Sequence, residues 1–302
     1  MDLEEKKVGI KDIFLNPRKK EWWYTGFLDS KRQVYFSLVF IRSPLISKFR
    51  FNVFDSNRTS PSIYHKTLSF DKSQQTGKLD LKKRTNDFII SYSGDEQDGW
   101  RFELQDGDIS ANVKMEPRQK SFTKFDDYVV NDYNVLLLMN NKADGKVKFG
   151  NRIYDIKNGQ GIYDHCFGKV PRKTRWHWLA VQNRRFSLAS WVNHDKLSQK
   201  YSIISLNGKK NLSWKLDHNV SFECINDQNS RDWKATSSDM NLNIKIIMSS
   251  DYSEKIPAIF PFLVNLNHNE HFIEVKGKVR IGGKWTSTGK LYGVMEDHFG
   301  KW

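Results

Sequence analysis

Two short motifs occur twice in this 302-residue chain, in the same order, and this repetition restricts the possible folds more than any other feature. The first motif is aromatic, EWWY at residues 21–24 and RWHW at residues 175–178. The second is YDHCFGK at residues 163–169, which returns one residue tighter as EDHFGK at residues 296–301. Each aromatic motif is followed by a long body that ends in an Asp-His motif. This order predicts two related domains.

The two predicted domains, residues 1–157 and 158–302, are each long enough to bury a core. Hydrophobic residues make up 38% of the chain and aromatic ones 14%, so Phe, Tyr and Trp supply much of the apolar surface, which favours strands. Short segments with period-2 alternation, such as FRFNVF at residues 49–54, recur between Gly- and Asp-rich turns. No segment keeps a 3.6-residue apolar period. We therefore predict an all-β protein of two antiparallel β-barrels with few short helices.

The charge of the chain is basic throughout. Its formal net charge of +14 predicts attraction to anionic partners, among them an anionic membrane surface, although a lysine-rich solvated surface explains the charge as well. No clustered basic motif occurs, so we expect no nucleic-acid partner. Two cysteines, Cys166 and Cys224, are too few for a disulfide framework, the first twelve residues lack an apolar signal segment, and no apolar run reaches the ~18 residues of a membrane span. A cytoplasmic location, or one peripheral to a membrane, is expected.

One copy of each motif lies in residues 161–182. Strand geometry places Tyr163 and His165 on one face and Asp164 on the other. Because adjacent strand residues point to opposite faces, these residues cannot form a nucleophilic triad among themselves. Asp164 and His165 either take part in chemistry or fix a strand end through hydrogen bonds. The recurrence of the pair at residues 297–298 agrees with the second role.

Signatures of the common cofactor and metal sites are missing from the sequence. It has no glycine-rich phosphate loop, no paired Cys-x-x-Cys, no His-Glu-x-x-His and no Gly-x-Ser-x-Gly. His165, His177, Asp297 and His298 would meet around zinc only if the two domains converged, and their spacing does not support such a site. We expect neither a cofactor nor a metal ion.

Three segments resemble the landmarks of the AttH-like and carotenoid 1,2-hydratase (hydroxyneurosporene synthase) family: EWWYTG at 21–26, GIYDHCFG at 161–168 and RWHWLAVQ at 175–182. Their order and approximate spacing are similar too, and a looser match covers residues 272–293. The resemblance implies two lipocalin-like β-barrels packed together. It also implies a bulky hydrophobic ligand, an isoprenoid or a polyene, and cofactor-free hydratase, cyclase or isomerase chemistry. A non-catalytic carrier of lipids or other hydrophobic ligands, or a membrane-surface protein, is the alternative.

The Asp-His signature of that family falls on Asp164 and His165, which makes His165 the expected general acid or base, with Asp164 and Tyr163 beside it. Asn193 stands where the resemblance leads us to expect the hydratase acid, so no carboxylate is found there, although protonating an alkene requires an acid. Large aromatic side chains would form the walls of the ligand site or, alternatively, pack the barrel cores. These aromatic residues are Trp22, Tyr24, Trp176, Trp178 and Trp191.

Overall fold

The computed structural model describes residues 19–29, 31, 33–42, 47–68, 79–118, 133–169, 173–195, 200–207, 212–227, 230–256 and 264–301. All regular structure in these segments is β, in strands β1 to β19, which confirms the predicted all-β class. None of the few short helices that we expected lies in the described segments, and these segments hold no helix long and apolar enough to cross a bilayer.

The first sheet has ten strands in the order β4-β3-β2-β1-β10-β9-β8-β7-β6-β5, all antiparallel to their neighbours. Aromatic and β-branched residues, as in VYFSLVFIR of β2, give these segments their preference for strands. The strands are β1 (Lys19–Asp29), β2 (Val34–Arg42), β3 (Ser47–Asp55), β4 (Ser62–Leu68), β5 (Leu79–Arg84), β6 (Phe88–Asp95), β7 (Gly99–Asp106), β8 (Ile109–Pro117), β9 (Tyr133–Phe149) and β10 (Arg152–Lys169).

The second sheet has nine strands in the order β14-β13-β12-β11-β19-β18-β17-β16-β15. Gly282 and Gly283 form the two-residue turn between β18 and β19, with φ values of 55° and 81° in the left-handed region that favours glycine. The strands are β11 (Lys173–Gln182), β12 (Phe186–Asn193), β13 (Lys200–Leu206), β14 (Ser213–Lys215), β15 (Ser221–Asp227), β16 (Ser230–Ser237), β17 (Met240–Ile256), β18 (Val264–Ile281) and β19 (Lys284–Lys301).

The two sheets repeat one connectivity. The first strand of each, β1 or β11, lies between the second strand and the last strand of its own sheet. The register repeats as well, because Phe167 of β10 lies opposite Glu21 and Phe299 of β19 lies opposite Arg175. In both sheets the aromatic motif therefore pairs at the same offset with the Phe-Gly-Lys end of the second motif.

The chain passes from one sheet to the other between Lys169 and Lys173. The predicted boundary between residues 157 and 158 falls inside β10, where the ladder shifts register between Ile156 and Gly159 and Asn158 has a φ of 54°. Gly and Asn favour the turn-like backbone of this bulge, which interrupts the ladder without ending the strand. Whether each sheet folds as a domain of its own stays a prediction.

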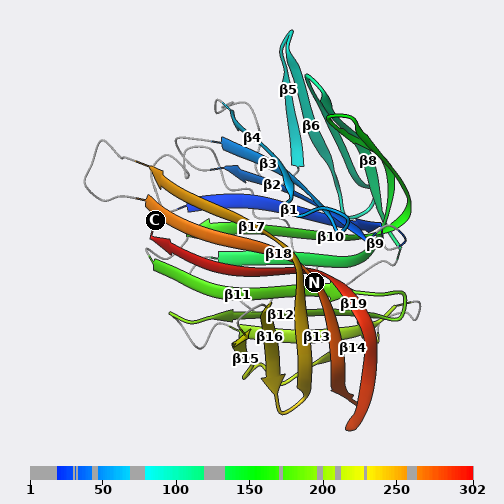
Figure 1. Cartoon of the computed structure of the whole chain (residues 1–302), viewed down its shortest axis with the longest axis vertical. Helices are drawn as coiled ribbons and strands as arrows, with labels where there is room; N and C mark the ends of the chain where they lie inside the picture. The colour runs from blue at the N-terminus through cyan, green and yellow to red at the C-terminus, as the bar shows by residue number, and fades with distance from the viewer. Residues whose placement is uncertain are drawn as a thin grey trace.

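Each sheet curls around its own hydrophobic core. In the first, Phe49 and Phe51 of β3 pack across the curl on Phe102 of β7, with ring centroids 5.7 Å apart in both pairs. In the second, His177 of β11 packs across it on Trp233 of β16, with ring centroids 5.1 Å apart. Figure 1 shows the two curled sheets in the upper and lower halves of the molecule. They match the expected pair of lipocalin-like barrels.

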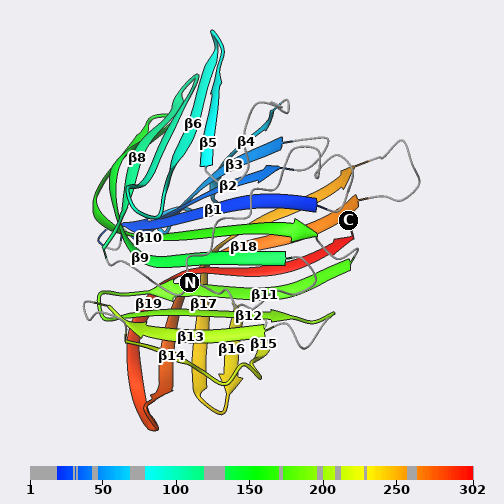
Figure 2. The ribbon, with the colours of Figure 1, turned by 180° about the vertical axis from the view of Figure 1, so that it is seen from behind.

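A third hydrophobic cluster joins the two barrels. The outer face of β1 and β2 packs there against β11 and β18. Tyr35 stacks on Phe272, with ring centroids 5.6 Å apart, and Tyr24 meets the edge of Trp178 at 5.2 Å. Figure 2, from behind, shows β1, β9 and β10 next to the layer of β11, β18 and β19. This contact between barrels holds the candidate site.

Candidate active site

The predicted catalytic residues of β10 lie on two sides of the first sheet. Tyr163 and His165 point into the first barrel, where Tyr163 stacks on Trp100 at 3.9 Å and His165 stacks on Trp23 at 5.0 Å between ring centroids. Asp164 points the other way and lines a cavity between the barrels. The strand alternation predicted this separation. The three residues therefore do not meet in one site.

His165 belongs to a buried ion-pair network inside the first barrel. Its Nε2 lies 3.0 Å from Oε1 of Glu21, and the Arg42 guanidinium donates to the other carboxylate oxygen. Arg42 also lies over the Trp23 ring, 5.1 Å from its centroid. Burial alone would raise the pKa of Glu21, but the hydrogen bond from His165 and the charge of Arg42 outweigh burial and lower that pKa. These contacts tie β1, β2 and β10 together.

A cavity of about 40 Å³ lies between the barrels, large enough for a water molecule or two. Four of the five aromatic residues predicted as ligand walls line it. The fifth, Tyr24, is not part of the lining but contacts the lining residue Trp178 edge-on. Trp22 of the first barrel stacks on Trp176 of the second, with ring centroids 6.4 Å apart. The lining residues are Trp22, Val135, Asp164, Cys166, Trp176, Trp178, Trp191, Tyr201 and Glu296.

The duplication places one carboxyl group from each barrel in this cavity. Asp164 lies opposite Tyr24 on β1, and Glu296 lies opposite Trp178 on β11, so the two acids occupy equivalent positions of the repeat. Aligning the two copies of the Asp-His motif within the sequence matches Asp164 with Asp297, which is one residue out of register with the strand pairing. Asp297 instead corresponds to His165.

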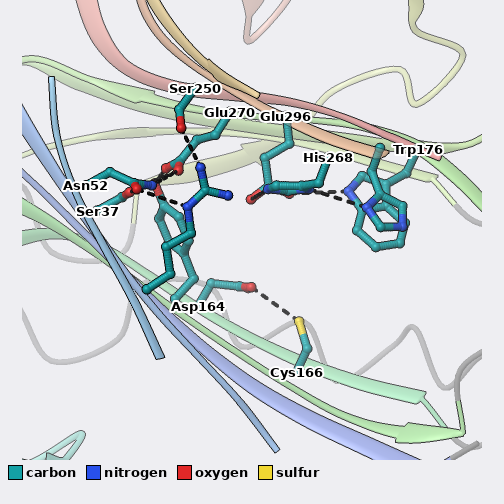
Figure 3. Close-up of polar contacts among 12 residues, drawn as sticks. Ser37, Asn52, Asp164, Cys166, Trp176, Ser250, His268, Glu270 and Glu296 are labelled. Atoms are coloured by element: carbon teal, nitrogen blue, oxygen red, sulfur yellow. Dashed lines mark hydrogen bonds and ion pairs between the residues drawn. The ribbon is translucent and has the colours of Figure 1, made fainter. Parts of the chain in front are cut away.

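A second glutamate, Glu270 of β18, lies near the cavity and is held by donors from the first barrel (Figure 3). It accepts hydrogen bonds from the Tyr24 hydroxyl at 2.9 Å, the Ser37 hydroxyl at 2.9 Å and the Asn52 amide at 2.8 Å. Burial raises its pKa, while the charge of Arg50 and these three hydrogen bonds oppose the rise. Because each of these contacts favours the anion, Glu270 is the carboxyl group best suited to carry a charge.

Glu296 has the opposite character. It lies directly across the ladder from Glu270, and two like charges at such a position repel each other. Burial and the charge of Glu270 raise its pKa well above the ordinary range, against a single 3.2 Å hydrogen bond from the Trp176 indole. Burial likewise raises the pKa of Asp164 to about 7, although the Cys166 thiol donates to it at 3.2 Å. The protonated form of Glu296 is therefore favoured over its carboxylate relative to a carboxyl group in water, and Asp164 titrates near neutrality.

The four residues considered for a zinc site do not converge. His165 lies in the first barrel, whereas His177 contacts Asp297 at 3.4 Å and His194 at 2.6 Å inside the second. His298 faces the gap between the barrels, stacked on Trp176. Among the residues that the structure describes, no group of three or more His, Cys, Asp and Glu side chains is arranged to hold a metal ion.

Sequence reasoning missed Glu270 and Glu296. Asn193, at the position expected for the acid, accepts a hydrogen bond from the Asp195 amide at 3.0 Å and has no proton-donating carboxyl group. Aligning the repeat on its Phe-Gly-Lys ends, instead of on Asp-His, would have matched Glu296 with Asp164. No signal in the sequence pointed to Glu270.

Comparison with known proteins supports the class of fold defined above. No family model matches the sequence, and a search of curated proteins finds no relative. The crystal structure of kievitone hydratase from Nectria haematococca matches with a TM-score of 0.63 and 12% identity, over 94% of this chain and 90% of that one. A candidate AttH from Nitrosomonas europaea matches with a TM-score of 0.61 and 14% identity, over 92% of each chain. These similarities confirm the two-barrel lipocalin-like fold and, at the level of fold, the predicted resemblance to AttH-like proteins.

Proposed function

We propose that the site between the barrels binds a hydrophobic small molecule and adds water to one of its carbon–carbon double bonds. The observation that carries this proposal is a mostly buried Glu296, whose pKa is raised, lining a tryptophan-walled cavity together with Asp164. A carboxylic acid kept neutral by burial is a proton donor at neutral pH. One solved protein of the same fold is a hydratase, which agrees with this chemistry.

In the proposed reaction Glu296 gives its proton to one carbon of the double bond and becomes a carboxylate. The neighbouring carbon becomes cationic, and the faces of Trp176 and Trp178 stabilise that charge. A water molecule in the cavity attacks this carbon and loses a proton to Asp164, which completes the alcohol. If a proton leaves an adjacent carbon instead, the double bond has moved and the product is an isomer. The same acid therefore supports isomerase or cyclase chemistry.

The size of the cavity limits how a ligand enters. Sites for drug-sized ligands are roughly 300–1,000 Å³, whereas this one has about 40 Å³. A bulky isoprenoid or polyene therefore fits only after the stacked Trp22 and Trp176 move apart. The present volume suits the water that the reaction consumes.

A non-catalytic carrier remains the alternative function. A lipocalin-like carrier would hold its ligand inside a barrel. The interiors of both barrels are instead packed with side chains, including Phe36, Phe51 and Trp100 in the first and Phe186, Leu188 and Ile273 in the second. This packing favours the site between the barrels for either function.

The test is hydration of a panel of isoprenoid alkenes and conjugated polyenes in ¹⁸O-labelled water, followed by mass spectrometry. We expect at least one product heavier by one labelled water, and a rate lower by roughly 10²–10⁴-fold in the Glu296→Gln variant. His165→Gln is the matched control and retains turnover. If the protein binds the conjugated polyene parinaric acid but converts no member of the panel, the carrier function replaces the enzyme.

A further inference from the structure

Glu296 lies at the inner end of a row of polar side chains that the proposed reaction does not yet use. Nε2 of His268 lies 3.8 Å from Oε1 of Glu296, and Nδ1 of His268 lies 3.3 Å from Nδ1 of His298. Nε2 of His298 lies 3.1 Å from the Thr174 hydroxyl. Figure 3 shows His268 beside Glu296, with Trp176 next to them. The row runs from the cavity toward the start of β11, where Lys173 is exposed.

The fold itself does not require these histidines, because the first barrel builds the equivalent positions without them. His268 and His298 form a cross-strand pair on β18 and β19. In the repeat register their counterparts are Val135 and Cys166, a cross-strand pair on β9 and β10 that lines the same cavity. The cavity acid of the first barrel, Asp164, thus has no pair of histidines beside it. Only the acid of the second barrel is connected in this way.

We propose that His298 and His268 are positioning residues that form a proton relay to Glu296 and restore its proton after each turnover; this rests on the function proposed above. When Glu296 is protonated, its O–H points at Nε2 of His268, His268 donates from Nδ1 to His298, and His298 donates from Nε2 to Thr174. When Glu296 is ionised, every donor points the other way. One proton enters at the Thr174 end and one reaches Glu296, while each histidine keeps a single N–H bond that has moved to its other ring nitrogen.

The surroundings keep both histidines neutral, as this exchange requires. Burial, followed by the charge of Arg50 on β3, lowers the pKa of His268 to about 3. Burial, followed by His268 and the charge of Lys20 on β1, lowers the pKa of His298 well below its ordinary value. A neutral imidazole has one donor and one acceptor nitrogen, so it passes a proton on without holding a charge. His271 acts on His268 in the same direction as Arg50.

Trp176 keeps this row in place. Its ring stacks on His298 at 3.6 Å between centroids, and its indole N–H donates to Oε2 of Glu296 at 3.2 Å. Oε1 of Glu296 is left facing His268. The 3.8 Å separation is longer than a hydrogen bond, and such contacts commonly shorten when a ligand closes the site.

The relay can be tested without knowing the substrate. The carbonyl stretch of the protonated Glu296 is identified by infrared spectroscopy as the band that disappears in Glu296→Gln. Its shift on transfer into D₂O then reports how fast the carboxyl proton exchanges. We expect His268→Phe and His298→Phe to keep the band but to slow its exchange by about 10²-fold, the lower end of what a positioned acid or base contributes. Added imidazole should restore fast exchange in His298→Ala.

His165→Gln is the matched control, because it removes a buried histidine that lies inside the first barrel, on the other side of the sheet from this row. It should leave both the band and its exchange rate unchanged. Far-UV circular dichroism confirms folding, and the glutamine variant at the same position, His268→Gln or His298→Gln, replaces a phenylalanine variant that unfolds. Unchanged exchange in the folded histidine variants overturns the relay and leaves the acid role of Glu296 intact. If Glu296→Gln removes no band, Glu296 is ionised, and both the relay and its role as acid are wrong.

Discussion

Replacing Asp164 by Asn should change how the stability of the protein depends on pH. The Asp164 side chain is buried between the barrels, where its pKa rises from 3.8 to about 7. Between these two values the unfolded chain has released the proton while the folded protein still holds it. The free energy of unfolding of the wild type therefore falls as pH rises through this window. Asn has nearly the same shape and does not titrate.

The size of the effect follows from the gap between the two pKa values. Each pKa unit is worth 1.36 kcal/mol, so the wild type loses about 4 kcal/mol of stability between roughly pH 4 and pH 8 through Asp164. Asp164→Asn lacks this loss. The difference in unfolding free energy, variant minus wild type, should therefore rise by about 4 kcal/mol over that range. Urea denaturation at a series of pH values measures it.

Asp297→Asn provides a control with the opposite sign. The hydrogen bond from His177 lowers the pKa of Asp297, so its contribution to stability is complete above 3.8 and is lost only as pH falls below that value. This variant should be less stable than the wild type, with a parallel curve from about pH 5 to pH 8. If the curve of Asp164→Asn also runs parallel to the wild type, Asp164 is ionised in the fold and the reasoning fails.

Three further predictions concern the barrels and the surface. His165→Gln should lower stability by about 1.5–3 kcal/mol through loss of the buried hydrogen bond to Glu21, with parinaric acid binding unchanged; weaker binding would show that His165 belongs to the ligand site. Gly293→Ala should lower stability by about 1–3 kcal/mol, because a Cβ would collide with the backbone carbonyl of Ala180; an unchanged Tm would show that β11 and β19 separate easily. With its +14 net charge, the protein should bind vesicles containing acidic lipid, and this binding should fade as the Debye length falls from about 30 Å at 0.01 M salt to about 10 Å at 0.1 M. Equal binding to neutral vesicles would contradict that role of the charge.

Local geometry explains what could be predicted from the sequence. Alternation along β10 is a property of any strand, so it separated Asp164 from Tyr163 and His165 correctly. Turn residues and alternating aromatic residues identified the all-β class because they, too, depend only on local backbone geometry. The repeat was visible in short motifs, but an Asp-His pair that looks conserved between copies was aligned one residue out of register with the backbone.

The rest of the site depends on contacts between distant strands. Glu270 and Glu296 become neighbours only through the ladder of β18 and β19. Their different pKa shifts depend on the first barrel, because Ser37 and Asn52 supply donors to Glu270 across the gap. How far the pKa of each carboxyl group rises is a consequence of that packing, and neither the periodicity nor the composition of the sequence indicates it.

A crystal structure with parinaric acid bound would test the central claim most directly, because that claim locates the ligand site between the two barrels. Our account predicts the polyene between the barrels, against Trp176 and Trp178, with Trp22 moved aside and a double bond next to the Glu296 carboxyl group. A polyene inside the first barrel, against Tyr163 and Trp100, would contradict it and would return the site to the interior side of β10.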